Sequence, residues 1–199
     1  YSKFLSLTSE NSTPLEKTKI YLQCHERDRV PDQEKIFNQK SNFSWNSIYQ
    51  ILLPYFDNKL SRLEQVYLAD YNGKLLYNFN PINSRIINNF GIEMLAPILN
   101  DELLLAAPHI PTRYKYDKNN NVGKLPLRTI LNQNGHDSLV TKQKLGFNVN
   151  TINLWKSYGY ELCKEFLLDS RVVKDGWINI NWIQKHIHNP ELDVRYVNK

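Results

Sequence analysis

Apolar residues recur at helical spacing along most of this chain, and almost no segment alternates apolar and polar residues as a strand does. The longest such stretch starts at Asn150 or Thr151 and continues for several turns. Its apolar residues are Ile152, Leu154, Trp155, Tyr158, Leu162, Cys163, Phe166 and Leu167. The pattern predicts a mainly α fold with this aromatic face in the core.

Local signals predict where other helices begin and end. Thr13-Pro14-Leu15-Glu16 combines an N-cap, a first-turn proline and a capping-box glutamate, so we expect a helix to about His25 that buries Leu15, Ile20 and Leu22. Ser44 is expected to cap a helix that ends near Pro54. A short helix is expected around Trp182.

The remaining segments give weaker expectations. Residues 57–80 are expected to form two helices with a break near Asn72-Gly73, a typical turn dipeptide. Residues 101–107 are expected to form a helix on the core face, ended by Pro108. Residues 1–12 carry few structural signals, and residues 172–180 are expected to form a loop.

Composition excludes several classes of protein. A chain of 199 residues, 41% hydrophobic, can form one domain or a large piece of one. No apolar run approaches the about 18 residues of a membrane helix, and no signal-peptide pattern opens the chain. Cys24 and Cys163 lie in no metal-ligand spacing, and His186 and His188 would point to different sides of a helix. We therefore expect no metal site, no membrane partner and a cytoplasmic location.

The formal net charge of +5 is spread along the chain rather than concentrated in runs. A nucleic-acid binder with Tyr and Trp as stacking surfaces is one interpretation, but the dispersed pattern does not favour it. A solvated surface is the simplest interpretation, and a phosphate-rich ligand is the other.

Lys124 is the first candidate for a functional residue. Gly123 and Lys124 follow an Asn-rich linker, 117–121, and precede Pro126 and a short apolar run at helical spacing. Because proline fits the first turn of a helix, Lys124 should lie at a helix N-terminus, where anions bind. Its ammonium could there meet a phosphate or a developing oxyanion. The alternative is a solvated loop lysine.

The order of residues around Lys124 resembles a known family. Gly123-Lys124, two residues, Leu127-Arg128, and then Lys142, Lys144 and Gly146-Phe147 are similar to the C-terminal part of the synthetase domain of glutamine-hydrolysing asparagine synthetases. The ATP-dependent β-lactam synthetases share that domain. The family has Arg-x-Lys-x-Gly-Phe in the last motif, where this chain has Lys142 as the first basic residue.

A second block upstream carries the same resemblance. Residues 90–104 resemble the family's Gly-Leu-Glu-x-Arg-x-Pro-Phe-Leu-Asp, with Glu93 and Pro97 matching. Leu95 stands in place of the arginine, and Asn100 in place of the aspartate. Asn80-Pro81 stands near the family's Asp-Arg pair, with a few extra residues before Glu93. The resemblance covers residues 57–199, whereas residues 1–56 match poorly.

The resemblance implies a fold, a reaction and a site. The fold would be the helical C-terminal portion of an α/β adenine-nucleotide α-hydrolase-like synthetase domain. The reaction would be ATP- and Mg²⁺-dependent adenylation of a carboxylate such as aspartate, followed by attack of ammonia or an amine. Glu93 and Lys124 would be catalytic, and Lys124, Lys144 and Arg128 would bind the nucleotide. Structural or electrostatic support, with Arg128 paired with a carboxylate, is the alternative role of Lys144 and Arg128. An exposed carboxylate at a helix end is the alternative for Glu93.

The family's pyrophosphate loop, Ser-Gly-Gly-x-Asp-Ser, does not occur in this chain, and neither does a Walker A or GxGxxG pattern. Residue 1 is Tyr1, neither methionine nor the catalytic cysteine of the family's glutaminase domain. We therefore expect a fragment, a subunit of a split enzyme or a degenerate relative. It would be inactive alone and would need the missing nucleotide-binding half as its partner. A non-catalytic helical scaffold or partner-binding module is the alternative function.

Overall fold

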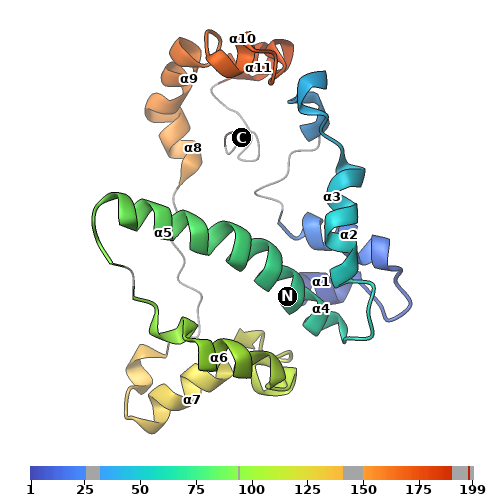
Figure 1. Cartoon of the computed structure of the whole chain (residues 1–199), viewed down its shortest axis with the longest axis vertical. Coiled ribbons are helices and arrows are strands. Elements are labelled where there is room, and N and C mark those ends of the chain that lie inside the picture. The colour runs from blue at the N-terminus through green and yellow to red at the C-terminus, as the bar shows by residue number, and fades with distance from the viewer. Residues whose placement is uncertain (26–31, 94, 141–149, 190–196, 198–199) are drawn as a thin grey trace. The chain divides into compact units, whose positions relative to one another are not determined.

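The computed structural model describes residues 1–25, 32–93, 95–140, 150–189 and 197. The described chain is mainly helical, which confirms the expected class (Figure 1). Its only sheet within these ranges is an antiparallel pair, β1 (Tyr116–Asp117) and β2 (Val122–Gly123). The chain divides into two units, one of Tyr1–Glu10 with Tyr55–Gly146 and one of Asn11–Pro54 with Phe147–Lys199.

The first unit contains the hairpin and most of the candidate residues. Its helices are α1 (Ser2–Leu7), α4 (Arg62–Ala69), α5 (Asn80–Asn89), α6 (Asp101–Ala106) and α7 (Leu125–Gln133). A π-helical segment covers Asp70–Phe79, and 3₁₀ turns cover Pro97–Leu99, Ala107–His109, Thr112–Tyr114 and Asp137–Leu139.

The second unit is helical within its described residues. Its helices are α2 (Pro14–Gln23), α3 (Trp45–Leu52), α8 (Thr151–Leu154), α9 (Tyr160–Phe166), α10 (Arg171–Lys174) and α11 (Ile180–Ile187). A π-helical segment, Trp155–Gly159, joins α8 to α9, and 3₁₀ turns cover Gln33–Lys35 and Gln39–Ser41. Another 3₁₀ turn, Leu53–Tyr55, follows α3.

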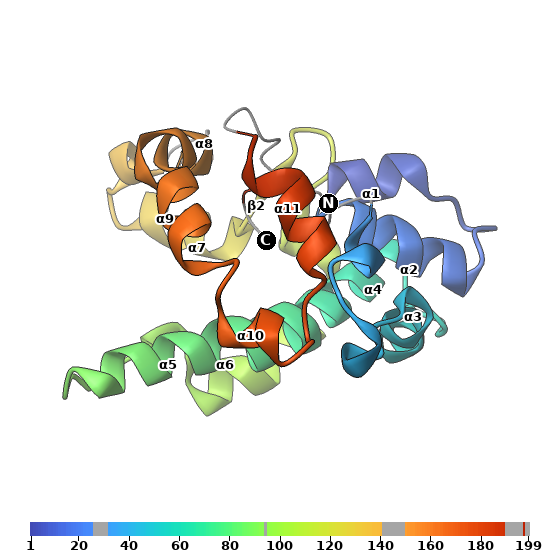
Figure 2. The same ribbon diagram turned by 90° about the horizontal axis from the view of Figure 1, so that it is seen from above.

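The predicted break near Asn72-Gly73 is wrong, because α4, the π-helical segment and α5 form one continuous helix (Figures 1 and 2). The Asn72 side chain donates to the Leu68 carbonyl at 2.9 Å, within the helix, instead of starting a turn. The π-helical bonding precedes Pro81, and the Asn80 N–H donates to the Leu75 carbonyl, five residues back. Proline lacks an N–H and crowds the carbonyl four residues earlier, so the wider turn falls where the α-helical pattern is hardest to keep.

The core of the first unit includes α1, although residues 1–12 gave few signals. Phe4 is 2% exposed, and its ring centroid lies 5.8 Å from that of Phe56. Arg62 ties the end of α1 to α4, because its Nη1 donates to the Leu5 carbonyl at 2.9 Å and its Nε pairs with Glu10 at 3.0 Å. These tertiary contacts order a segment whose local preference is weak. The other buried apolar residues are Leu63, Val66, Ala69 and Tyr116.

The core of the second unit joins segments far apart in sequence. Its buried apolar residues are Tyr21, Ile36, Trp155, Ile183 and Ile187. Phe37 and Ile178 form an antiparallel bridge, and the Asn179 N–H donates to the Ile36 carbonyl at 2.8 Å. Trp155 lies in the core as expected, but the rest of the expected core face of this helix is wrong, because Leu154, Tyr158, Leu162 and Phe166 are exposed.

In this unit the predicted starts of the helices agree with the structure better than the predicted buried faces of the helices do. The side chains of Thr13, Ser44 and Asn150 cap α2, α3 and α8 as predicted. The expected burial of Leu15 is wrong: α2 turns Lys17, Thr18 and Tyr21 inward instead. The expected loop 172–180 is wrong in its first part, because most of α10 lies there. The first backbone hydrogen bonds of α10 run from the N–H groups of Val173 and Lys174 to the Ser170 carbonyl.

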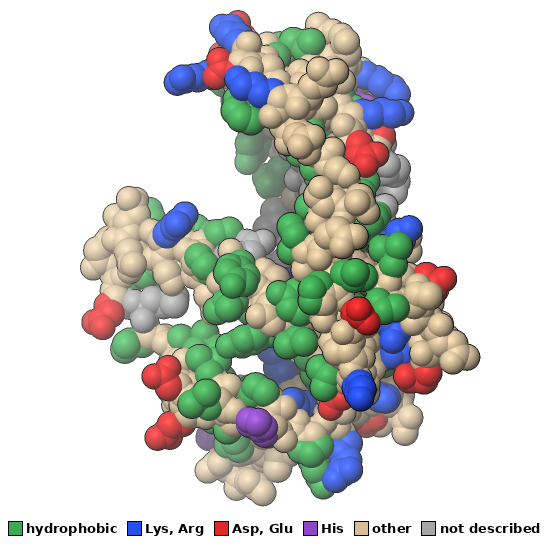
Figure 3. Space-filling model, turned by 45° about the vertical axis from the view of Figure 1, so that its right-hand side comes forward, with side chains coloured by type: hydrophobic (Ala, Val, Ile, Leu, Met, Phe, Trp, Pro, Cys, Tyr) green, Lys and Arg blue, Asp and Glu red, His purple; other side chains and the backbone are tan. Residues whose placement is uncertain are grey.

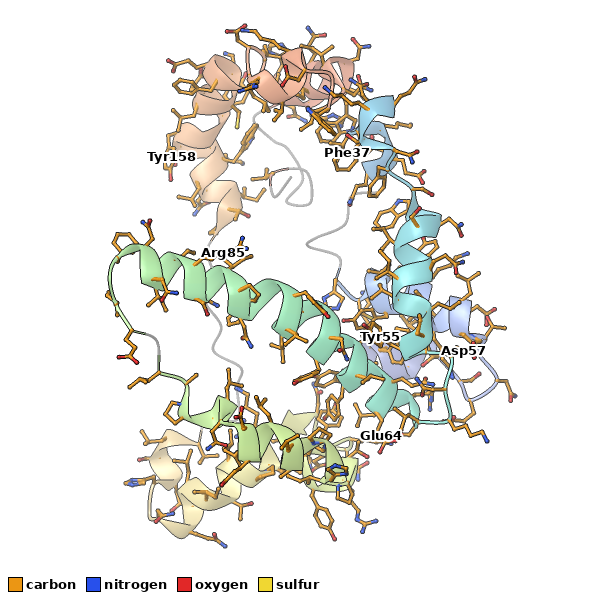
Figure 4. All side chains as sticks on the ribbon, viewed as in Figure 1. Phe37, Tyr55, Asp57, Glu64, Arg85 and Tyr158 are labelled. Atoms are coloured by element: carbon orange, nitrogen blue, oxygen red, sulfur yellow. The ribbon has the colours of Figure 1, made fainter. Side chains whose placement is uncertain are left out.

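Replacing Ser61 with alanine is expected to lower the free energy of unfolding by about 1 kcal/mol at pH 7. Ser61 caps α4 by accepting from the Glu64 N–H, and the Glu64 carboxylate accepts from the Ser61 hydroxyl at 2.7 Å and N–H at 2.9 Å (Figure 4). Urea unfolding at pH 7 and at pH 3 would measure the loss. The exposed Ser47, inside α3, offers Ser47→Ala as the matched control.

The penalty of Ser61→Ala should depend on pH in one direction. The Ser61 hydroxyl, and then its N–H, lowers the pKa of the Glu64 carboxyl below 4.5. A lowered folded-state pKa means that the stabilisation is present above the unfolded pKa and disappears as the pH falls through the folded value. The penalty should therefore shrink at pH 3. A penalty that is equal at both pH values would show that the carboxylate contributes nothing to the cap.

Candidate active site

Lys124 lies between the hairpin and α7, in a strained backbone conformation. The predicted helix is present as Leu125–Gln133, with Pro126 in its first turn. Lys124 is its N-cap, with φ 58° and ψ 35°, in the left-handed region that disfavours residues other than glycine. Its side chain is exposed. Strain of this kind is retained only where surrounding contacts fix the backbone.

The hairpin before Lys124 is more ordered than its Asn-rich sequence suggested. The Asp117 carboxylate accepts from the N–H groups of Asn119 at 2.9 Å and Asn120 at 3.2 Å. The Asn120 side chain and these N–H groups lower the pKa of the Asp117 carboxyl. Tyr116 is buried, and its hydroxyl donates to the Asn121 side chain at 2.6 Å. The linker is therefore a turn anchored by a buried aromatic residue.

Arg128 contacts the peptide groups on both sides of Lys124. Its Nε donates to the Gly123 carbonyl at 2.9 Å, and its backbone N–H donates to the Lys124 carbonyl at 3.1 Å. The side chain is half-buried. The resemblance implied nucleotide binding by Arg128, with structural or electrostatic support through a carboxylate as the alternative, and both roles stay predictions. The contact with the Gly123 carbonyl was not predicted.

The N-terminus of α7 offers fewer backbone donors than expected. The Leu125 N–H already donates to the Lys115 carbonyl at 3.3 Å, and Pro126 has no N–H. Lys115 is itself held in place, because its Nζ donates to the Ala107 carbonyl at 2.9 Å, and burial lowers the pKa of its ammonium. An anion arriving here would therefore meet the Lys124 side chain rather than a cradle of amides.

Glu93 follows the turn that ends α5. The Ile92 N–H donates to the Ile87 carbonyl at 3.3 Å and the Gly91 N–H to the Asn88 carbonyl at 3.0 Å, a Schellman motif. Gly91 has φ +67°, a left-handed backbone conformation that favours glycine, which explains why a glycine stands at this position. The turn releases the chain from α5 two residues before Glu93, whose side chain is exposed.

Asn100, at the position of the family's aspartate, caps α6. Its side-chain oxygen accepts from the Leu103 N–H at 2.8 Å, as an aspartate oxygen would do. The helix is present as predicted, but its expected core face is wrong, because Leu103 is 47% and Leu105 73% exposed. Leu95, at the position of the family's arginine, is also exposed.

Glu93 and Lys124 are not joined by an ion pair or a hydrogen bond. Across the described ranges, neither side chain forms an ion pair or a side-chain hydrogen bond. Lys144, together with Lys142 and Gly146-Phe147, lies outside the described residues. The predicted catalytic and nucleotide-binding roles of these residues therefore stay predictions.

Sequence reasoning missed the residues that hold the Lys124 turn, namely Lys115, Tyr116 and Asn121. The one available signal was an aromatic residue directly before an Asx turn, Asp117 to Asn120. Within the described ranges there is no cluster of three or more His, Cys, Asp or Glu side chains that could hold a metal, and no helix long and apolar enough to cross a membrane.

Comparison with protein families agrees with the motifs around Glu93 and Lys124. A family model for asparagine synthase matches residues 9–197. This chain belongs to the asparagine synthase family. The asparagine synthase match starts well before residue 57, where the recognisable resemblance begins, so it also includes α2 and α3. No curated protein and no solved structure matches the chain.

Proposed function

We propose that this chain is part of an ATP-dependent amide-forming ligase of the asparagine-synthetase type. The reaction would activate a carboxylate, such as that of aspartate, by adenylation with release of pyrophosphate. Ammonia or an amine would then displace AMP to form the amide. The observation that carries the proposal is the family match over residues 9–197, which includes both Glu93 and Lys124.

Lys124 would act on the phosphate charge in this reaction. Its ammonium is exposed at the end of a fixed turn and is bound to no described carboxylate, so it can meet a phosphate oxygen as a point charge. Glu93 would accept a proton from the attacking amine, since its side chain is exposed and forms no ion pair with a described cation. Lys144 would add positive charge near the phosphates, and Arg128 would support the site.

The residues present fit ATP only in part. Lys124 suits a phosphate, and ATP would supply the adenylyl group that activates the substrate carboxylate for amide formation. The pyrophosphate loop is absent from the sequence, and the described residues hold no carboxylate cluster suited to Mg²⁺. We therefore assign the main nucleotide and Mg²⁺ site to a nucleotide-binding partner, in the same polypeptide or in a second one. No step of the mechanism is assigned to Mg²⁺ in this chain.

Exposed apolar side chains favour a partner, and they also support the alternative function of a non-catalytic scaffold. Tyr77 is 74% and Phe90 72% exposed, on or next to the helix that runs from α4 to α5. Phe79, Ile82 and Ile86 on the same helix are more than half exposed. Hydrophobic side chains are widespread on the visible surface, with charged ones scattered between them (Figure 3). Large exposed apolar patches are uncommon on monomers and typically mark interaction sites.

Affinity capture of the natural protein, followed by intact-mass measurement and identification of its partners, would test the proposal. We expect the Ser-Gly-Gly-x-Asp-Ser motif in the captured material, in this polypeptide or in a second one. Captured material with that motif should release pyrophosphate from ATP when it is given a carboxylate substrate. A protein of about this size that travels without the motif would exclude the ligase function and favour the scaffold.

A further inference from the structure

We propose that Arg128 is the positioning residue for Lys124: it holds the two peptide groups around Lys124 so that the lysine stays in the left-handed conformation. Arg128 donates to the Gly123 carbonyl through Nε at 2.9 Å and to the Lys124 carbonyl through its backbone N–H at 3.1 Å. These carbonyls belong to the peptide groups that precede and follow Lys124. This role rests on the proposed function of Lys124 as the phosphate-binding cation.

The hydrogen bond to Gly123 opposes the movement that would release Lys124. A lysine with φ 58° can relax by a flip of the peptide group between Gly123 and Lys124, which changes ψ of the glycine and φ of the lysine together. The flip would turn the Gly123 carbonyl away from the Arg128 Nε. Since glycine restricts ψ little, the glycine itself would not prevent it. Arg128 therefore supplies the restraint that Gly123 does not.

Gly123 is not needed to make room for a neighbouring group, so its role is backbone flexibility. A Cβ added there would lie 3.9 Å from Cδ2 of Tyr116, an ordinary contact, and Gly123 does not have a positive φ. On either side the chain is fixed, because Gly123 pairs with Tyr116 in the hairpin and the Leu125 N–H donates to the Lys115 carbonyl at 3.3 Å. The peptide group between Gly123 and Lys124 lies between these two anchors, and the hydrogen bond from Arg128 Nε to the Gly123 carbonyl fixes its orientation.

The test is a double-mutant cycle in the natural protein, with pyrophosphate release as the first readout. Arg128→Met removes the guanidinium and keeps an apolar stem. It is expected to lower kcat about tenfold, with KM for ATP within about twofold, because the displaced Lys124 ammonium would stabilise charge that develops during the reaction more than the charge already present on bound ATP. In a Lys124→Ala background Arg128→Met should have no further effect. Arg128→Lys, which keeps a donor on a flexible stem, should restore part of the rate.

Hydrogen exchange of the Leu125 amide is the second readout and does not depend on activity. We expect Arg128→Met to speed its exchange about fivefold or more, without a matching change in α4. Arg85 is exposed on α5, so Arg85→Met is the matched control (Figure 4). It should change neither readout.

Each failure has its own pattern. An unchanged Leu125 exchange rate, or full activity of Arg128→Met in an active protein, would overturn the positioning role. A raised KM for ATP that persists in the Lys124→Ala background would show direct nucleotide binding by Arg128 instead. If the natural protein releases no pyrophosphate, the proposed function fails, and the exchange measurement alone decides whether Arg128 holds the turn.

Discussion

Replacing Lys124 with alanine is expected to lower kcat/KM for pyrophosphate release about 100- to 1,000-fold in the natural protein. A single preorganised group that stabilises developing charge typically contributes this much. The ammonium projects from a turn fixed by Arg128 and the hairpin, and no described carboxylate neutralises it. Steady-state pyrophosphate release, with ATP and the carboxylate varied separately, would measure the loss.

Lys124→Gly separates the side chain from the backbone. It removes the same ammonium, so the rate should fall as far as in Lys124→Ala. Glycine accepts φ 58° without a steric penalty, however, and relief of that penalty should raise the free energy of unfolding by ~1 kcal/mol. A variant that is more stable and inactive would indicate that the strain is kept for function. Retention of the wild-type rate in both variants would exclude Lys124 from catalysis.

Replacing Glu93 with glutamine is expected to lower amide formation about 100-fold while carboxylate adenylation continues. A positioned general base typically contributes two or more orders of magnitude, and glutamine keeps the size of the side chain but cannot accept the proton. Exchange of labelled pyrophosphate into ATP reports adenylation alone, and amide product reports both steps. The two assays together should show a block after adenylation.

The exposed Glu102 of α6 supplies the control for this prediction. Glu102→Gln removes one carboxylate from the same unit and should leave both assays unchanged. If Glu93→Gln lowers exchange and amide formation equally, Glu93 acts before the amine attacks, and its assignment as a base would be wrong. Equal activity of Glu93→Gln and the wild type would leave Glu93 as an exposed carboxylate after α5, which was the alternative considered from sequence.

Helix starts could be predicted because their determinants are local. Thr13, Ser44 and Asn150 each bond to a backbone N–H two or three residues later, so a few letters of sequence suffice. Helix faces and helix ends depend on distant partners. The α1 segment is ordered by Phe56 and Arg62, which lie more than fifty positions away in sequence. Likewise, Asn72-Gly73 reads as a turn, but the buried face of α4 just before it keeps the helix continuous.

In the candidate site, too, features set by neighbouring residues could be predicted from the sequence, and features set by distant residues could not. The sequence predicted Lys124 at the start of a helix, because Pro126 and the apolar run after it are adjacent. It did not predict the left-handed backbone of Lys124 or the contact of Arg128 with Gly123, since both require the hairpin to be in place. Nor could it indicate whether Glu93 and Lys124 approach each other, because that distance depends on how the segments between them pack.

The π-helical segment Asp70–Phe79 also affects how this helix tolerates changes in length. Successive residues of an α-helix are about 100° apart around its axis, so one residue added or lost in a regular helix rotates everything beyond it by more than a quarter turn. A wider turn can take up an added residue locally and leave the helix continuous. The same wider turn should absorb the loss of one residue from Asp70–Phe79, whereas a deletion inside the regular helix α5 would redirect the chain that leaves it at Gly91, and with it the position of Glu93.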